Sequence, residues 1–212
     1  MGWPIPNIQG MLQRIGRKNP KLFAKFDLTQ GYYQGPVGVK SRDKAAFITS
    51  RGLYRWKRLP MGLKGAPSWF QQNMATKVLA GLLYNSCEVY LDDVIVYGST
   101  EDEFINNMKL ILERFQEFNM TLNPEKCEIG LKEIEYVGHV INEKGTTFSK
   151  EKIQEVVNFV RPITQRQLKG FLGLVNYFRS NVRNFSDIVV PLNRVLRNYK
   201  PHKRIDWTDE LQ

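Results

Sequence analysis

The sequence predicts an α+β fold, an antiparallel sheet with packed helices, followed by a smaller helical unit. Over residues 1–148, strand-length apolar stretches rich in β-branched and aromatic residues alternate with amphipathic stretches of helical spacing. Near the middle, residues 89–97 place two adjacent acids between two apolar runs, a pattern typical of a β-hairpin with the acids at its turn. After residue 148 the composition changes, and helical patterns continue to residue 204.

The elements before the hairpin follow from spacing and from chain-breaking residues. Asn7 suits the N-cap of a helix over residues 7–17. A strand over residues 22–28 ends at Asp27, and a glycine- and proline-rich turn segment at residues 59–67 leads into the next helix. That helix places apolar residues at helical spacing as far as residue 82. Shorter antiparallel strands are predicted over residues 37–39, 46–49 and 53–56.

The elements after the hairpin begin with a capping-box sequence at Thr100 and Glu103. The helix it starts is expected to place one apolar face on the sheet: Phe104, Met108, Ile111, Phe115 and Phe118. Strands are predicted over residues 127–131 and 134–141, with Gly138 in the middle of the second, where glycine often marks a close approach to a ligand. Three helices should complete the chain, over residues 149–160, 164–178 and 186–197.

Charge is distributed unevenly along the 212 residues, whose formal net charge is +10. Residues 149–204 carry 12 Lys/Arg and 3 Asp/Glu, and residues 40–64 carry eight bases and one acid. Residues 88–148, in contrast, hold five bases and thirteen acids. Two basic segments thus flank an acidic one, as expected of a metal-dependent enzyme that acts on a polyanion, although ordinary charged helix faces give the same counts.

Three carboxylates form the candidate site. Asp92 and Asp93 occupy the hairpin turn, and Asp27 closes a strand that can lie beside it. Two adjacent acids repel each other unless they are solvated or share a cation, so a solvent-exposed Asp-Asp turn is the simpler alternative. With Asp27 added, the set suits Mg²⁺, which takes oxygen ligands together with substrate phosphates.

Other features narrow the setting. Cys87 and Cys127 are too few for a disulfide framework and lack zinc-site spacing, which indicates a reducing, intracellular location. No apolar run reaches the length of a membrane span, so no membrane partner is expected. The first residues also lack the pattern of a signal peptide.

Several motifs, in this order, resemble a reverse transcriptase, and most of all that of Ty3/Gypsy-like long-terminal-repeat retrotransposons. They are Phe-Asp-Leu-Thr-Gln-Gly-Tyr at residues 26–32, Leu-Pro-Met-Gly-Leu-Lys-Gly-Ala-Pro at 59–67, Tyr-Leu-Asp-Asp at 90–93, Leu-Asn-Pro-Glu-Lys-Cys at 122–127 and Tyr-Val-Gly-His at 136–139. Residues 171–179 resemble the same elements' thumb. The resemblance covers nearly the whole chain.

This resemblance implies a right-hand polymerase. Residues 1–148 would form the palm and part of the fingers, residues 149–204 a helical thumb, and residues 205–212 the start of a connection to a further domain. The implied activity is RNA-directed DNA polymerisation from dNTPs on an RNA/DNA template-primer duplex, with two Mg²⁺ ions that Mn²⁺ can replace. The implied context is a polyprotein with ribonuclease H and integrase, and the implied location is the cytoplasm, a retrotransposon particle or the nucleus.

The resemblance also assigns residue roles. The catalytic acids would be Asp27, Asp92 and Asp93, with the Leu28 carbonyl as a further metal ligand. The nucleotide-binding residues would be Tyr32, the gate that excludes a ribose 2′-hydroxyl, and Met61, Gly62 and Lys126. The nucleic-acid-binding residues would be Lys64, Tyr136, Val137, Gly138, His139, Arg166 and Lys169.

Other readings remain open at this point. Family members have a longer N-terminal fingers segment with basic residues, so we expect residues 1–212 alone to polymerise poorly. An inactive nucleic-acid-binding remnant of the fold is the main alternative. A palm polymerase that makes RNA is disfavoured by the aromatic Tyr32, and a metal-dependent nuclease leaves the other motifs unexplained.

Overall fold

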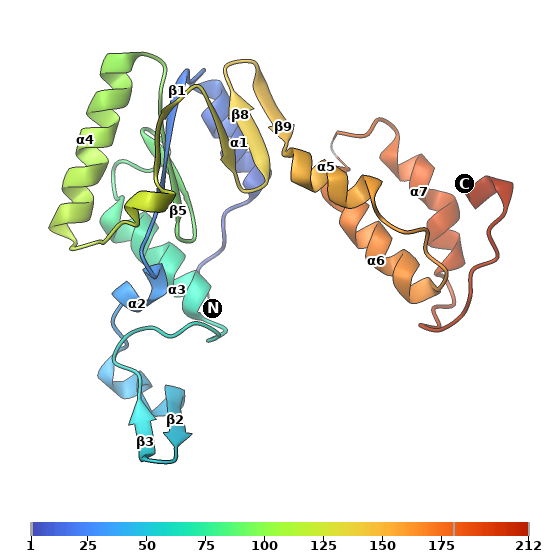
Figure 1. The fold of residues 1–212 in the computed structure, drawn as a ribbon, viewed down its shortest axis with the longest axis horizontal. Helices are drawn as coiled ribbons and strands as arrows, with labels where there is room; N and C mark the ends of the chain where they lie inside the picture. Colours follow the sequence, from blue (N-terminus) through green and yellow to red (C-terminus); the bar gives the residue numbers. More distant parts are fainter. Residues whose placement is uncertain (1, 180, 212) are drawn as a thin grey trace. The chain divides into compact units, whose positions relative to one another are not determined.

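The computed structural model describes residues 2–179 and 181–211 and divides the chain into two compact units. The sheet unit spans residues 1–148, and the helical unit spans residues 149–212. Figure 1 shows the elements of each. Within the described part of the chain, no helix combines the length and the apolar character needed to cross a membrane.

The sheet unit is built on a four-stranded antiparallel sheet with the order β4-β5-β1-β6. The strands are β1 (Leu22–Asp27), β4 (Cys87–Tyr90), β5 (Asp93–Gly98) and β6 (Glu128–Leu131). The expected hairpin is therefore present, with a two-residue turn between β4 and β5. Strand β1 pairs with β5 along its whole length, so the two strands that bear the acids are neighbours in the centre of the sheet.

Each face of this sheet has its own core, because successive strand residues point to opposite faces. One face is covered by α3 (Ala66–Asn73), its π-helical extension η3 (Met74–Val78) and α4 (Glu101–Glu117). The other face is covered by α1 (Ile8–Arg17), with Asn7 as N-cap, and by the strands that follow β6. Helix α4 buries four of its five predicted apolar residues, but Phe118 lies just past its end and is 39% exposed.

A second antiparallel sheet consists of β7 (Glu133–Tyr136), β8 (His139–Asn142) and β9 (Gly145–Phe148). The predicted single strand over residues 134–141 is wrong, because Val137 and Gly138 form a turn with φ values of +50° and +73°. Two successive positive φ values are typical of a two-residue hairpin turn. Gly138 therefore lies at this turn and not within a strand, and β9 is a strand that the sequence analysis missed.

A separate hairpin consists of β2 (Ala46–Thr49) and β3 (Gly52–Arg55), which pair only with each other. Both strands were predicted. The strand predicted over residues 37–39 is absent: the chain forms the short 3₁₀ turns η1 (Val39–Ser41) and η2 (Asp43–Ala45) instead. The single turn α2 (Gly31–Gln34) follows β1 and precedes this region.

The helical unit contains α5 (Lys150–Val157), α6 (Gln165–Val175), α7 (Phe185–Val195) and the 3₁₀ turns η5 (Asn176–Phe178) and η6 (Asp209–Leu211). Ser149 caps α5, and Thr164 with Gln167 forms the predicted capping box of α6. Apolar side chains of these helices line a groove of about 330 Å³. The unit packs these helices with few fully buried side chains, among them Leu168.

Candidate active site

The strand register places two of the three acids side by side. Asp27 ends β1 directly opposite Asp93, which begins β5. Directly paired residues of antiparallel strands point to the same face of a sheet. Asp92 precedes Asp93 in the turn, where Leu91 adopts a left-handed conformation with φ of +58°. The chain therefore gathers its three candidate carboxylates at one end of the central strands.

The pKa of Asp93 is affected by burial and by the charged groups near it. Its pKa is raised above the ordinary aspartate value, chiefly by burial; Lys25 lowers it, and the charges of Asp92 and Asp27 raise it further. Among the ion pairs within residues 2–179 and 181–211, none involves these three carboxylates. The ionised form of Asp93 is therefore disfavoured by both other acids and favoured by the charge of Lys25.

The donor set suits a hard divalent cation only in part. In the described part of the chain, no three His, Cys, Asp or Glu side chains are arranged to hold a metal by themselves. Carboxylate oxygens and the Leu28 carbonyl, which accepts a hydrogen bond from the Gly31 N–H at 3.1 Å, are the available ligands. Mg²⁺ typically binds one or two carboxylates and completes its shell with water and substrate phosphates, so these residues fit such an open site.

Gly31 and Tyr32 lie beside Asp92. A Cβ at Gly31 would lie 3.2 Å from the Asp92 Cβ and 3.3 Å from the Phe70 ring, so a side chain there would crowd the acid. The Tyr32 ring packs on Phe70 with 5.1 Å between centroids. Burial raises the pKa of Tyr32, and the Asp92 charge adds to the effect. Tyr32 is thus a half-buried ring next to the acidic turn.

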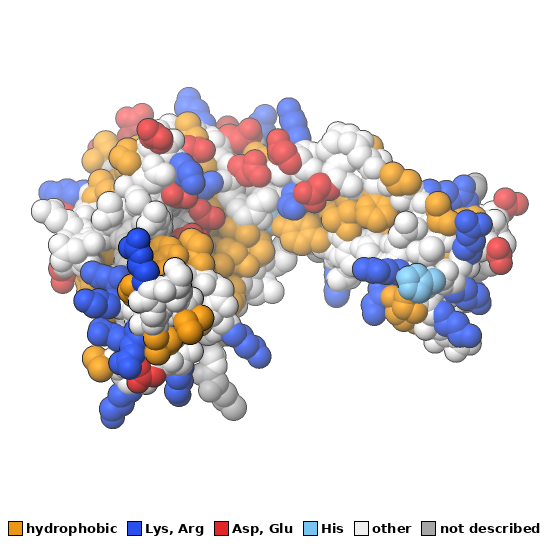
Figure 2. All heavy atoms as spheres, turned by 60° about the horizontal axis from the view of Figure 1, so that its bottom comes forward, with side chains coloured by type: hydrophobic (Ala, Val, Ile, Leu, Met, Phe, Trp, Pro, Cys, Tyr) orange, Lys and Arg blue, Asp and Glu red, His pale blue; other side chains and the backbone are white. Residues whose placement is uncertain are grey.

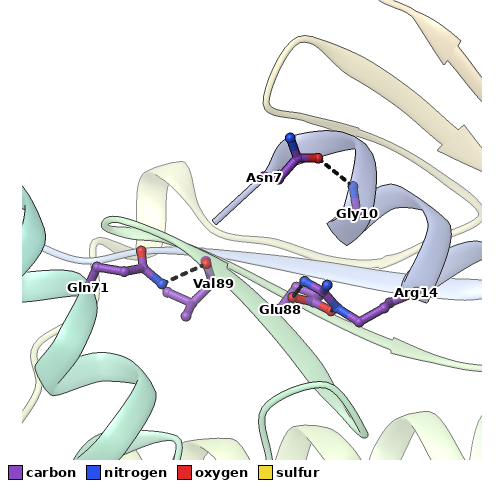
Figure 3. Close-up of polar contacts among 6 residues, drawn as sticks. All are labelled: Asn7, Gly10, Arg14, Gln71, Glu88 and Val89. Atoms are coloured by element: carbon purple, nitrogen blue, oxygen red, sulfur yellow. Dashed lines mark hydrogen bonds and ion pairs between the residues drawn. The ribbon is translucent and has the colours of Figure 1, made fainter. Parts of the chain in front are cut away.

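Gln71 is a contact that the sequence analysis missed. This α3 side chain is 1% exposed; its Nε2 donates to the Val89 carbonyl at 3.1 Å, and its Oε1 accepts from the Leu91 N–H at 2.7 Å. Figure 3 shows the amide directed at the β4 backbone. The sequence does mark this residue as unusual. Gln71 lies three positions before the buried Met74 and seven before the buried Val78, so a polar residue falls on the apolar stripe of the helix.

An ion pair between a partly exposed arginine and a buried acid supports β4 from the other side and was also missed. Arg14 of α1 donates from Nε and from a terminal nitrogen to the two Glu88 carboxylate oxygens, at 2.6 and 2.9 Å (Figure 3). Glu88 is 1% exposed, and burial raises its pKa although Arg14 acts in the opposite direction. An acid inside an otherwise apolar strand marks Glu88 as unusual in the sequence. Its partner could not be identified from local sequence, because Arg14 lies 74 residues earlier.

Of the predicted residues at 136–139, Tyr136 touches the acidic turn. Its hydroxyl donates to the Asp93 carbonyl at 3.2 Å, and burial raises its pKa well above the ordinary value. His139 lies across the β7–β8 turn with Nδ1 3.1 Å from the Val137 carbonyl oxygen, and burial lowers its pKa. This turn is thereby attached to the strand that begins with Asp93.

The remaining predicted residues are exposed. Met61, Gly62 and Lys64 lie in the segment before α3, and no hydrogen bond or ion pair among described residues joins them to the carboxylates. Lys126 is exposed in η4 (Pro124–Lys126). The residue before η4, Asn123, donates its backbone N–H to the Asp27 carbonyl at 2.9 Å. In the helical unit, Arg166 and Lys169 are exposed on α6.

The β2–β3 hairpin carries a basic and aromatic surface. Figure 2, in which this end of the sheet unit comes forward, shows Lys and Arg side chains gathered with hydrophobic ones. The Phe47 ring lies 5.8 Å from the Tyr54 ring and 5.2 Å from the Trp56 ring, between centroids. Rings beside basic side chains are a composition suited to single-stranded nucleic acid.

A cavity of about 610 Å³ opens at the opposite end of β1 and contains none of the predicted site residues. Its walls mix lysines with acids, including Lys21, Lys132 and Glu133. Asp27 and Asp93 instead lie at the other end of the β1–β5 pair, with Asp92 in the adjoining turn.

Comparison with known proteins identifies the fold. Over 100% of this chain and 36% of the other, it matches a structure described as the foamy viral protease-reverse transcriptase dRH in complex with ds DNA, with a TM-score of 0.86 and 24% identity. The predicted α+β fold, an antiparallel sheet with packed helices as in a polymerase palm, is confirmed by this similarity.

Sequence relatives are longer transposon proteins. The Retrovirus-related Pol polyprotein from transposon 412 of Drosophila melanogaster is 34% identical over 99% of this chain, which spans 16% of that protein. Transposon Tf2-3 polyprotein of Schizosaccharomyces pombe is 31% identical over 97% of this chain, which spans 15% of it. Both agree with the predicted retrotransposon resemblance. The family model described as "Reverse transcriptase (RNA-dependent DNA polymerase)" matches residues 4–141, and the chain belongs to this family.

Proposed function

We propose that this chain is the polymerase core of a retrotransposon reverse transcriptase, which transfers nucleotides from dNTPs to a primer 3′-hydroxyl on an RNA or DNA template. The observation that carries the proposal is the register that sets Asp27 opposite Asp93, next to Asp92, in a member of this family. The foamy viral protein of the same fold is described in complex with ds DNA, which supports a duplex partner.

The acids have distinct tasks in this proposal. Asp27 and Asp92, with the Leu28 carbonyl, would hold two Mg²⁺ ions, or Mn²⁺ in their place, and Asp93 would add negative charge behind them. Bound ions would supply activation of the primer hydroxyl and stabilisation of charge on the leaving pyrophosphate. Tyr136 holds the Asp93 backbone, so the turn's position does not depend on the acids alone.

The nucleic acid would be held by surfaces around the acids. We assign residues 1–148 to the palm and part of the fingers, with the β2–β3 surface and Lys64 contacting nucleic acid. Residues 136–139 would position the primer, while Met61, Gly62 and Lys126 would lie near the nucleotide. Residues 149–204 would form the thumb, in which Arg166 and Lys169 contact the duplex backbone. Residues 205–212 would lead toward a further domain.

The setting of the whole protein is likewise a proposal. The polyprotein relatives support a longer parent protein, in which we place ribonuclease H and integrase. Both cysteines are free thiols, which suits the reducing, intracellular location expected from the sequence.

The test of the reaction is primer extension with and without Asp92. Extension of a DNA primer on an RNA template should require Mg²⁺ and dNTPs. Asp92→Asn should reduce kcat at least about 10³-fold while leaving template-primer affinity within about threefold, because a carboxylate ligand is lost and the fold is kept. Undiminished extension by the variant would refute the assignment. A longer parent protein that binds duplex but extends no primer would favour the remnant alternative.

Sugar discrimination provides a second test. Tyr32→Ala should lower the dNTP preference, measured as the ratio of kcat/KM for dNTP and rNTP, by about 10- to 100-fold, because the ring beside Asp92 no longer occupies the 2′ position. Tyr33→Ala is the matched control, since the Tyr33 ring packs on the ring of Trp56, the residue after β3, with 5.8 Å between centroids. An unchanged ratio for Tyr32→Ala would make that ring a packing residue only.

A further inference from the structure

The turn that carries Asp92 contains an unfavourable backbone conformation. Leu91 has φ of +58°, a left-handed conformation that costs a residue with a branched side chain more than it costs glycine. The turn has only two residues, because Tyr90 pairs with Asp93. Such conformations persist when the surrounding structure fixes them, and they cluster where function needs a set geometry. The left-handed conformation of Leu91 therefore requires contacts that hold it in place.

Gln71 contacts the backbone on both sides of Tyr90. Its Nε2 donates to the Val89 carbonyl at 3.1 Å, and its Oε1 accepts from the Leu91 N–H at 2.7 Å. The side chain is 1% exposed, so both bonds form away from water, where an unpaired amide is costly. The same amide therefore ties α3 to the last paired residues of β4 and to the left-handed residue.

We propose that Gln71 is a positioning residue: its amide holds Leu91 in the left-handed conformation and so sets the Asp92 carboxylate for divalent-metal binding. The inference rests on the proposed function, since it concerns the same acid. The two hydrogen bonds of the Gln71 amide go to backbone atoms and not to the carboxylates, and one of them holds the residue directly before Asp92. Loss of the amide would let the turn relax and would spread the Asp92 carboxylate over several positions.

A comparison within the same sheet separates positioning from support. Asn107 of α4 is another buried amide on this face, 6% exposed, whose Nδ2 donates to the Tyr97 carbonyl at 2.9 Å. Tyr97 lies near the far end of β5 from Asp93. Removing either amide removes bonds between a helix and the central sheet. A change in metal binding should follow only from the loss at Gln71.

The experiment compares Gln71→Met and Asn107→Leu with the unsubstituted chain by three measurements. The first is Mn²⁺ affinity by electron paramagnetic resonance. The second is hydrogen exchange of the Leu91 amide. The third is kcat and KM for single-nucleotide incorporation. Gln71→Met should weaken Mn²⁺ binding about 10-fold, accelerate Leu91 exchange at least 10-fold and lower kcat about 10- to 100-fold, with KM for primer-template within about twofold. Asn107→Leu should change none of these more than about twofold.

A conservative variant tests the same idea from the opposite direction. In Gln71→Glu the carboxylic acid, when protonated, can donate to the Val89 carbonyl and accept from the Leu91 N–H, as the amide does. Its Mn²⁺ affinity relative to the unsubstituted chain should therefore be higher near about pH 6 than near about pH 8. This dependence would persist even if Gln71→Met folds poorly.

The outcomes separate this proposal from the proposed function. Unchanged Mn²⁺ affinity and unchanged Leu91 exchange in Gln71→Met would overturn the positioning role, whatever the activity. An equal loss of metal affinity in Asn107→Leu would also overturn it, because support of the sheet would then explain both. If neither the unsubstituted chain nor the longer parent protein incorporates nucleotide, the polymerase proposal fails, while Mn²⁺ affinity and Leu91 exchange still decide the role of Gln71.

Discussion

Two hairpins of the sheet unit have turns of the same length and opposite surroundings. The β4–β5 hairpin turns between Tyr90 and Asp93, and the β2–β3 hairpin turns between Thr49 and Gly52. Most residues of β4 and β5 are buried, whereas every residue of β3 and most of β2 are exposed. A short turn alone therefore does not determine how firmly a hairpin is held.

The difference shows where rigidity comes from in this chain. The β4–β5 strands lie between two hydrophobic cores and receive Gln71 from one side and Arg14 from the other. The β2–β3 strands pair only with each other, and a two-stranded hairpin by itself is marginal in water. We therefore expect the acidic turn to be fixed in the free protein, and the basic hairpin to gain order on contact with the proposed nucleic-acid partner.

The sharpest test of this comparison uses one substitution at two sites. Ile95 of β5 is 0% exposed and Ile48 of β2 is 82% exposed. Ile95→Ala should lower the free energy of unfolding by about 3 kcal/mol, because it removes buried methyl groups and leaves a cavity. Ile48→Ala should change it by less than about 0.5 kcal/mol. Urea unfolding measures both, and similar losses would show that β2–β3 is packed against something in solution.

The ion pairs of the two hairpins give a second matched pair. Arg14→Met should cost about 2–3 kcal/mol of unfolding free energy, because Glu88 is left buried without its partner. Arg55→Met removes the pair with Asp43, whose side chains are 59% and 67% exposed, and should cost less than about 0.5 kcal/mol.

A compensating change separates lost pairing from lost packing at Arg14. Arg14 also covers the Tyr84 ring, with 4.7 Å from its guanidinium carbon to the ring centroid. If the unpaired charge dominates, adding Glu88→Gln to Arg14→Met should recover most of the lost stability. If the double variant is no more stable than Arg14→Met, packing against Tyr84 accounts for the loss.

The smallest expected effect concerns the charge at the acidic turn. The folded-state pKa of Asp93 is raised, mainly by burial, so the ionised carboxylate destabilises the fold once pH exceeds that raised value. Asp93→Asn should therefore raise Tm at pH 7 by about 1–3 °C. The gain should vanish below about pH 3, where the carboxylate is mostly protonated in both folded and unfolded chains. A lower Tm at pH 7 would indicate that attraction to Lys25 exceeds the cost of burial.

Much of this architecture could be predicted from local patterns. Short apolar runs rich in β-branched and aromatic residues located β1, β4 and β5, and the capping residues Ser149 and Thr164 located the starts of α5 and α6. The errors fell where local signals were weak. At Val137-Gly138 a β-branched residue occupies the first turn position, so the run of apolar residues concealed the turn. Phe118 kept the helical spacing of α4 but lies beyond its last turn.

The missed contacts required long-range information. Gln71 and Glu88 are polar residues on otherwise apolar surfaces, which marks them as unusual without indicating their partners. Arg14 comes from a helix 74 positions earlier, and the Leu91 N–H becomes available only in a left-handed turn. The acids themselves were located by motif, but the pairing of Asp27 with Asp93 depends on the register of two distant strands.

The two-residue length of the Leu91-Asp92 turn also limits how this protein can change in length. Loops usually absorb inserted residues, because their backbone is solvated and unpaired. Here one inserted residue would either lengthen the turn and release the Gln71 bonds, or shift β5 by one position and turn Asp93 to the opposite face of the sheet. At Ser50-Arg51 the same insertion would meet only solvent-exposed strands. Libraries of length variants should therefore place insertions at the exposed hairpin and keep the acidic turn at two residues.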